Sequence, residues 1–373
     1  MKNKDAISND FIIQVAERFR PRTKPEKVLA GFDGFVDEIL HVIKQRVSPE
    51  EYIRMDFMNE FANNIAAAAG FSANMEYASQ QTKLGGNGPI LANALLAAGH
   101  EIDYIGTLGE DEIHPVYRIF CEKCMRVTSF LEPGKTDAIE FLDGKIMMGR
   151  MTDLEKMNFT NLLKHYPENE LLDTLRNSEL LVMTDWNALA GMNSIYDGFA
   201  ELLSRDERRI KVFIDLADPA KHSFEEIKEA MLKLGKLNKQ ADVMLGLNEN
   251  ESKLIAKALG LKSDEIVDRA ELIRKELNLY GVVIHPIAGA AVAVEGDSMW
   301  LDGPVTNCPK LTTGAGDNFN AGFCNGWLAG LAARECLVTG VSTSGFYVRN
   351  CYSPNCAELL DFMHVWAEGN LAD

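Results

Sequence analysis

The sequence is poor in basic residues for its length. Its 38 lysines and arginines stand against 55 aspartates and glutamates, which gives a net charge of −17 at pH 7. A partner such as nucleic acid or an anionic membrane needs a basic face, so this balance argues against both. The sequence also lacks the run of about 18 apolar residues that spans a bilayer, and its start has no apolar stretch suited to a signal peptide. We expect a soluble, cytoplasmic protein.

Cysteine is scarce as well. Seven cysteines, an odd number, are scattered over 373 residues, which is typical of reduced thiols in a cytosol. Cys121 and Cys124 form one C-x-x-C pair in a helical-looking stretch, without a second pair or a histidine cluster at zinc spacing. Structural cysteines are therefore favoured over a metal or redox site. The chain also has no internal repeat and no low-complexity linker, so residues 1–373 are predicted to form a single domain.

Short apolar segments alternate with helical stretches through most of the chain. The segments of strand length that are rich in Val, Ile and Leu are 27–32, 103–107, 180–184, 212–216, 243–247 and 281–285. The stretches with helical spacing are 87–98, 115–124, 194–204, 223–234, 249–259 and 263–277. This alternation predicts βαβ units and an α/β fold with a mainly parallel central sheet. Ligands of such sheets bind outside the carboxyl ends of the strands.

Three segments depart from the alternation. Residues 39–47 and 136–150, the latter with an Asp-Gly turn between apolar runs, indicate strands that leave the main sheet. The alternative for the second segment is a plain surface hairpin. The connection over residues 48–80 is long and alanine-rich at its centre, and it predicts an insertion of one or two extra, peripheral helices.

A glycine-rich loop with an acidic residue at its end is the strongest chemical signal. Thr312 and Thr313 precede Gly314, Ala315, Gly316 and Asp317, and an amphipathic run begins there. The N–H groups at a helix start, together with the positive end of the helix dipole, bind anions. A carboxylate in that place suits a base that faces a hydroxyl while the amides hold a phosphoryl group. The alternative for Asp317 is simple N-capping.

A second polar pair follows another predicted strand. Asn248 and Glu251 lie three residues apart where a strand meets a helix, so both side chains point to one side of the first turn. An amide and a carboxylate in that place suit Mg²⁺ held through water, and Glu249 is a competing acidic candidate. The alternative is a capping box, which has the same spacing.

Together with three other segments, this loop resembles the signature of the ribokinase-like (PfkB) family of sugar and nucleoside kinases. The segment from Gly85-Gly86-Asn87 to Gly99, followed by Tyr104-Ile105-Gly106 and Glu110-Asp111, is similar to the N-terminal signature of that family. Residues 241–251 resemble its Asn-x-x-Glu motif, and residues 31–39 resemble its first strand. The segments occur in the family's order and cover roughly residues 28–360.

The resemblance implies a three-layer αβα sandwich with a small β lid, and an ATP-dependent transfer of the γ-phosphoryl group to a hydroxyl of a small sugar. Mg²⁺ is the implied cofactor and Asp317 the implied base. A homodimer formed through the lid is compatible with the resemblance. The implied sugar-binding residues are Asp37, Asp33, Gly85, Gly86 and Asn87, of which Asp37 matches the family position better than Asp33, a residue that could instead cap the turn at Gly34. The implied nucleotide-binding residues are Thr312, Thr313, Asn318, His285, Gly289 and Asn248.

Three departures from the family pattern leave alternatives open. Leu311 stands where the family carries a cation-binding Asp, Ile90 stands where it carries a sugar-binding Asn, and residues 285–290 have lost most of the nucleotide motif. A nucleoside kinase or an ADP-dependent sugar kinase is the runner-up among enzymes. A catalytically weak regulator that binds sugar or nucleotide on the same fold is the alternative of another class.

Overall fold

A nine-stranded sheet forms the centre of the molecule. The computed structural model describes residues 9–19, 24–151 and 154–371. The strand order is β14-β13-β12-β11-β10-β9-β1-β5-β6. The strands are β1 (Lys27–Gly31), β5 (Glu101–Gly106), β6 (Arg126–Ser129), β9 (Leu180–Met183), β10 (Lys211–Asp215), β11 (Asp242–Leu247), β12 (Gly281–Ile284), β13 (Gly289–Val294) and β14 (Asp297–Asp302). All neighbours pair in parallel except β12 with β13 and β13 with β14, which are antiparallel.

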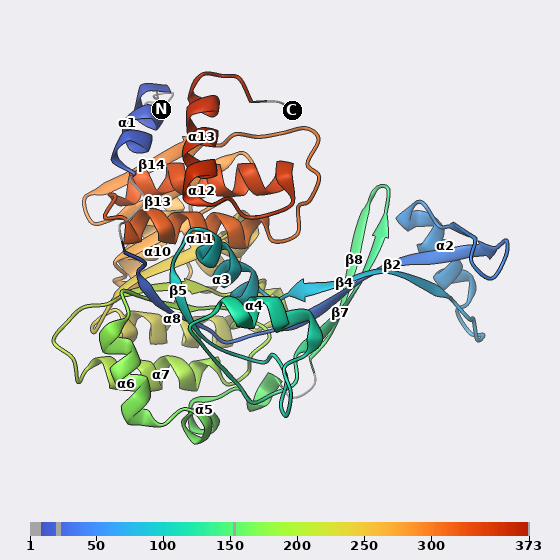
Figure 1. Cartoon of the computed structure of the whole chain (residues 1–373), viewed down its shortest axis with the longest axis horizontal. Helices are drawn as coiled ribbons and strands as arrows, with labels where there is room; N and C mark the ends of the chain where they lie inside the picture. The colour runs from blue at the N-terminus through green and yellow to red at the C-terminus, as the bar shows by residue number, and fades with distance from the viewer. Residues whose placement is uncertain (1–8, 20–23, 152–153, 372–373) are drawn as a thin grey trace.

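Helices cover both faces of this sheet (Figure 1). Residues that alternate along a strand point to opposite faces, so Val28 and Ala30 of β1 enter one hydrophobic core and Leu29 enters the other. The first core packs against α1 (Asn9–Arg18), α3 (Asn87–Ala97), α4 (Arg118–Lys123), α11 (Ala315–Leu328), α12 (Ala333–Asn350) and α13 (Cys356–Ala367). The second packs against α5 (Phe159–His165), α6 (Glu168–Asn177), α7 (Met192–Leu203), α8 (Phe224–Leu237), α9 (Glu249–Ala258) and α10 (Ile266–Leu277).

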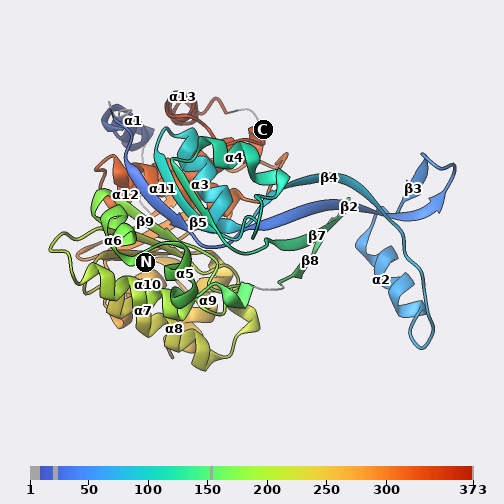
Figure 2. The ribbon, with the colours of Figure 1, turned by 60° about the horizontal axis from the view of Figure 1, so that its bottom comes forward.

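A second, smaller sheet projects from the body as a lid, and Figures 1 and 2 show it from two sides. Its strands are β2 (Phe35–Arg46), β3 (Tyr52–Arg54), β4 (Tyr77–Gly85), β7 (Gly134–Phe141) and β8 (Gly144–Arg150). Strand β2 pairs with β7 in parallel and with β4 and β3 antiparallel. The predicted αβα sandwich with a mainly parallel sheet and a β lid is therefore confirmed.

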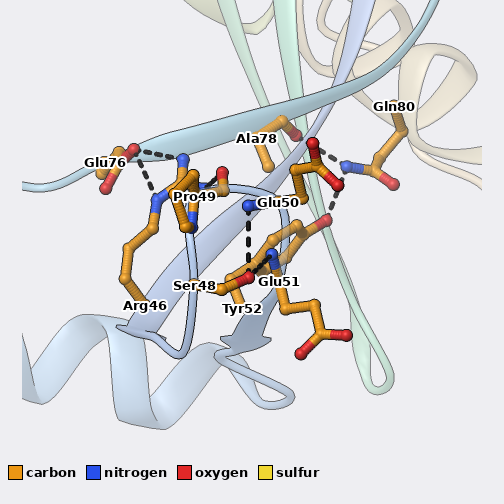
Figure 3. Close-up of polar contacts among 9 residues, drawn as sticks. All are labelled: Arg46, Ser48, Pro49, Glu50, Glu51, Tyr52, Glu76, Ala78 and Gln80. Atoms are coloured by element: carbon orange, nitrogen blue, oxygen red, sulfur yellow. Dashed lines mark hydrogen bonds and ion pairs between the residues drawn. The ribbon is translucent and has the colours of Figure 1, made fainter.

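The far end of the lid has a small core and a polar network of its own. Leu40, Val42, Met55, Phe61, Ile139 and Phe141 form the core, to which α2 (Met58–Ala67) contributes. In Figure 3, Arg46 pairs with Glu76 and donates to the carbonyl of Pro49, while Gln80 donates to the Tyr52 hydroxyl at 2.8 Å. These contacts join β2, β3 and β4 beyond the point where β7 ends. The far end of the lid is thus held together by its own core and hydrogen bonds, and the lid is more than a surface hairpin.

The structure differs from the sequence prediction in the lid and at one edge of the central sheet, and it adds the unpredicted elements β6, α5, α6, α12 and α13. The segment 48–80 holds one helix, α2, and also strand β3 and the first part of β4, so it is mostly part of the lid. Strand β2 begins at Phe35 instead of residue 39. The hairpin of β13 and β14 was not predicted. In the part of the chain that the structure describes, none of the helices has the length and apolar character that a membrane span requires.

Candidate active site

A cavity of about 380 Å³ opens where the lid joins the carboxyl ends of the central strands. Its walls come from both sheets, from the start of α3 and from the loop before α11. It is lined by Phe35, Asp37, Gly86, Asn87, Ile90, Thr136, Met147, Gly149, Met151, Asp185, Asn187, Ala188, Ala217, Lys221, Thr313, Gly314 and Asp317. Most of the predicted catalytic and sugar-binding residues therefore lie around one cavity.

In the loop before α11, residue 314 has a backbone conformation that only glycine adopts easily. Gly314 has φ +87°, and a Cβ there would lie 3.0 Å from the Tyr347 hydroxyl. That hydroxyl donates to the carbonyl of Thr313 at 2.8 Å, and the N–H of Ala315 donates to Thr312 at 3.2 Å. Among the described residues, no carbonyl accepts from the N–H groups of Gly316 and Asp317. Two amides at a helix start are thus left to bind an anion.

Asp317 lies in the first turn of α11, directly after this loop, and is only 7% exposed. The Asn87 side chain donates to its Oδ1 at 3.0 Å. Burial raises the pKa of Asp317 well above its ordinary value, and the neighbouring charge of Asp215 adds to this shift, whereas the hydrogen bond from Asn87 opposes it. A carboxylate with a raised pKa is a stronger base, which suits proton abstraction from a hydroxyl.

Asp37 projects from β2 into the same cavity. Burial raises its pKa, and the Thr136 hydroxyl and the charges of Lys83 and Lys145 oppose the shift. Its carboxylate lies directly over the Cα of Gly85, so that a Cβ at residue 85 would collide with it. This contact explains why a glycine ends β4 opposite β2.

Asp33 lies in a different place from its predicted one. It is fully buried and does not line the cavity. Its Oδ1 accepts from the N–H of Gly88 at 2.8 Å and from the Thr184 hydroxyl at 2.7 Å. The alternative role at Gly34 is not found either, because the carboxylate holds the start of α3.

Asn248 and Glu251 form a complete capping box at the start of α9. Glu251 accepts from the backbone and the side chain of Asn248 at 2.7 and 2.6 Å, and its own N–H donates to Asn248 Oδ1 at 2.9 Å. Burial raises the pKa of Glu251 to about 9, and the charges of Asp215 and Asp218 add to the shift. This concentration of carboxylates fits a divalent cation, which would relieve the repulsion. Among the described residues no group of three or more His, Cys, Asp or Glu side chains could ligate a metal, so such an ion would be held through water and phosphate oxygens.

Two of the predicted nucleotide-binding residues, Asn318 and His285, contact the same loop. Asn318 uses both ends of its side chain inside the protein, since it donates to Gly314 at 2.9 Å and accepts from Ser353 at 2.7 Å. The His285 ring packs against Phe319 at a tilt of 30° with 4.6 Å between ring centroids, and burial lowers the pKa of His285 to about 4. Both residues therefore support the loop. Gly289 is buried at the start of β13, whereas Ile287 just before it is 94% exposed.

Sequence reasoning missed several residues that line the cavity, and three of them carry a charge or an amide. Asp185 follows β9 and has φ +58°, a strained value for a non-glycine residue that is common at functional sites. Asn187 lies two residues further on, and its buried Oδ1 has no partner among the described residues. Lys221, after β10, is the only positively charged residue of the described lining. Their only signal in the sequence is that polar residues follow buried strands.

The cysteines are free thiols. Burial raises the pKa of Cys121 to about 11 and that of Cys124 to about 12. Neither thiol ionises readily at neutral pH, which argues against a redox pair.

The fold and the cavity define the class. The structure resembles a carbohydrate kinase from Agrobacterium tumefaciens (TM-score 0.62, 17% identity, covering 91% of this chain and 97% of that one) and Arabidopsis thaliana ribokinase complexed with ribose and ATP (0.62, 18%, 91% and 99%). A nucleoside kinase from Methanocaldococcus jannaschii is similar as well (0.60, 14%, 91% and 98%). These likenesses show the ribokinase fold.

The sequence comparisons narrow the class to one family. The family model of prokaryotic ketohexokinases matches residues 4–366. The ketohexokinase of Haloferax volcanii is 26% identical over 352 residues, which are 93% of each chain. This chain belongs to the prokaryotic ketohexokinase family, and it is a carbohydrate kinase of the ribokinase-like class.

Proposed function

We propose that the chain is an ATP-dependent ketohexokinase, which transfers the γ-phosphoryl group of ATP to a hydroxyl of a ketohexose such as fructose. The observation that carries the proposal is the Asp317 carboxylate, held by Asn87 beside two amides without backbone partners, at a cavity lined by hydrogen-bonding groups. Asp317 takes the proton of the attacking hydroxyl, while the N–H groups of Gly316 and Asp317 stabilise the migrating phosphoryl group.

The cavity favours a sugar over a nucleoside. Phe35 is the only aromatic residue of its described lining, whereas Asp37, Asn87, Asp185 and Asn187 offer carboxylate and amide groups. A base needs an aromatic or flat apolar surface on which to stack, but a sugar needs many hydrogen-bond acceptors. Asp185 and Asn187 therefore join Asp37 as ligands for sugar hydroxyls in this proposal.

The test is a comparison of acceptors and donors with the purified protein. Rates of sugar-dependent nucleotide consumption are measured with a ketohexose, ribose, an aldohexose and inosine, each with ATP and with ADP. We expect the highest kcat/KM for the ketohexose with ATP. A higher kcat/KM for inosine, or activity with ADP in place of ATP, would contradict the proposal.

We propose that Mg²⁺ is held near Glu251 through water, because this buried carboxyl lies close to Asp215 and Asp218, whose negative charges a divalent cation would offset. Excess EDTA should abolish activity, and Glu251→Gln should raise the Mg²⁺ concentration for half-maximal rate. Glutamine can keep the hydrogen bond from the Asn248 backbone but cannot ionise when the cation binds. Glu249→Gln, on the exposed side of the same turn beside Lys253, is the matched control and should change little. A Mg²⁺ requirement unchanged in Glu251→Gln would remove Glu251 from the metal site.

Asp37 should contribute to binding of the sugar, which accepts the phosphoryl group, and not to binding of ATP, which donates it. Replacing it with alanine should raise KM for the sugar about 10–100-fold, the worth of a hydrogen bond to a charged group of about 1.5–3 kcal/mol. KM for ATP should stay within a few-fold. Gly85→Ala should have a similar effect, because its Cβ would displace the Asp37 carboxylate. Equal increases in both constants would place Asp37 outside the sugar site.

We propose that two copies of the chain associate through their lids. Half of the large, exposed apolar side chains of the described residues belong to the lid or its base: Val47, Ile53, Phe57, Ile65, Phe71, Tyr77, Leu142, Met147, Met148 and Met151. Such a concentration on one element is typical of an association surface. Sedimentation should show a dimer that Phe71→Ser or Met148→Lys weakens, whereas Leu232→Ser on α8 should have no effect. A monomeric wild type at micromolar concentration would contradict the dimer.

A further inference from the structure

A buried carboxylate that does not itself line the cavity is nevertheless linked to Asp317, the base proposed above. Asp33 follows β1, and its Oδ1 accepts from the N–H of Gly88 at 2.8 Å. Gly88 is in the first turn of α3, next to Asn87, whose side chain donates to Asp317 Oδ1 at 3.0 Å. The path from β1 to the base therefore crosses two hydrogen bonds and one peptide unit.

The space around the Asp33 carboxylate is shaped for it. A Cβ on Gly86 would lie 2.6 Å from Asp33 Oδ2, and a Cβ on Gly88 would lie 2.5 Å from Oδ1. Gly86 also has φ +97°, which a side chain would disfavour. The two glycines thus let the turn close over the carboxylate. Two hydroxyls also donate to Asp33 without reaching the turn: Thr184, just after β9, to its Oδ1 at 2.7 Å, and Tyr104 of β5 to its carbonyl at 2.8 Å.

Burial of the Asp33 carboxylate also lowers the stability of the fold. Asp33 Oδ2 is buried without a hydrogen-bond partner among the described residues. An unpaired, buried carboxylate oxygen destabilises a fold, so an apolar residue would serve better if only packing were required. The carboxylate instead supplies an acceptor for the turn that carries Asn87.

We propose that Asp33 is a positioning residue for catalysis, which anchors the turn at Gly88 and thereby holds the Asn87 amide against Asp317. The proposal rests on the function proposed above, in which Asp317 is the base. Among the described residues, the Asn87 side chain makes no hydrogen bond other than the one to Asp317, so the position of its backbone decides where its amide lies. A displacement of about 1 Å at such a contact lowers turnover by about 100-fold.

The test is a double-mutant cycle on kcat. Asn87→Ala and Asp33→Ala should each lower kcat about 10–100-fold, the usual effect of losing a group that orients a functional residue. The double variant should be no slower than Asn87→Ala alone, because both changes remove the same contact. KM for ATP should stay within a few-fold in all three. Asp33→Asn, which keeps an oxygen acceptor for Gly88, should recover most of the lost turnover.

Thr184→Val is the matched control. It removes the other hydrogen bond to the same Asp33 oxygen but leaves the contact to Gly88, so kcat should remain within a few-fold of wild type. If Asp33→Ala fails to fold, Asp33→Ser, whose hydroxyl is one bond shorter, replaces it in the cycle. The proposal would be overturned if the losses of kcat in Asp33→Ala and Asn87→Ala were fully additive in the double variant. A wild-type kcat in Asp33→Ala, or in Asp33→Ser where it replaces the alanine variant, would overturn it as well. Near-normal turnover of Asp317→Asn would instead overturn the assignment of the base, whatever the cycle shows.

Discussion

The Asp317→Asn variant is expected to lose turnover by about 10²–10⁴-fold, the usual contribution of a positioned base. Asparagine has nearly the same shape, and its carbonyl oxygen can still accept from Asn87, so the site should keep its geometry. KM for sugar and for ATP should therefore change only a few-fold. Steady-state kinetics with both substrates varied separates the two effects.

The Asp215→Asn variant gives a second, independent test of Asp317 as the base. Asp215 is buried near Asp317 but lies outside the cavity, with its oxygens bonded to Ala217 and Asn320 at 2.8 and 2.5 Å. Its negative charge raises the pKa of Asp317. Removing that charge should lower the pKa of Asp317. Because the base acts only when it is deprotonated, the acidic limb of the plot of kcat against pH should then move to lower pH. A limb that moves to higher pH, or an Asp317→Asn variant with normal turnover, would contradict the role of Asp317.

Replacing Lys221 with methionine is expected to lower kcat by about 10²–10³-fold, as the loss of one donor to a developing charge does in other enzymes. The described lining holds three carboxylates, Asp37, Asp185 and Asp317, and a phosphoryl group adds further negative charge. Lys221 is the only lining residue there that can offset this charge. We propose that its ammonium faces the migrating phosphoryl group. Methionine keeps the length and apolar stem of lysine but lacks the charge.

Two measurements make the Lys221 prediction specific. Lys221→Arg should retain part of the turnover, and Lys228→Met, an exposed lysine on α8, should behave as wild type. Binding of ADP with aluminium fluoride and sugar, which mimics the transition state, should weaken as much as kcat falls in Lys221→Met. Weaker sugar binding with an unchanged kcat would instead show that Lys221 binds the sugar and does not contact the migrating phosphoryl group.

The sequence predicted those features that local patterns encode. Buried parallel strands are continuous runs of Val, Ile and Leu, and the loop around Asp317 has a distinctive combination of glycines and acid. Strand β4 was missed because residues 79–82 are exposed on both faces and therefore show no alternation. Asp33 was misplaced because its role is decided by a turn 55 residues away. Asp185 and Lys221 belong to no motif, and only the arrangement of strands β9 and β10 brings them to the cavity.

The most direct test of the account is the product stoichiometry of the wild-type protein with ATP, Mg²⁺ and a ketohexose. ADP and sugar phosphate are measured together, for example by ³¹P NMR. We expect one sugar phosphate for each ADP, and only slow ADP release without sugar, as follows if the lid closes over the bound sugar and keeps water out of the site. ADP released at the same rate with and without the ketohexose, and without any sugar phosphate, would contradict the assignment of a ketohexose kinase.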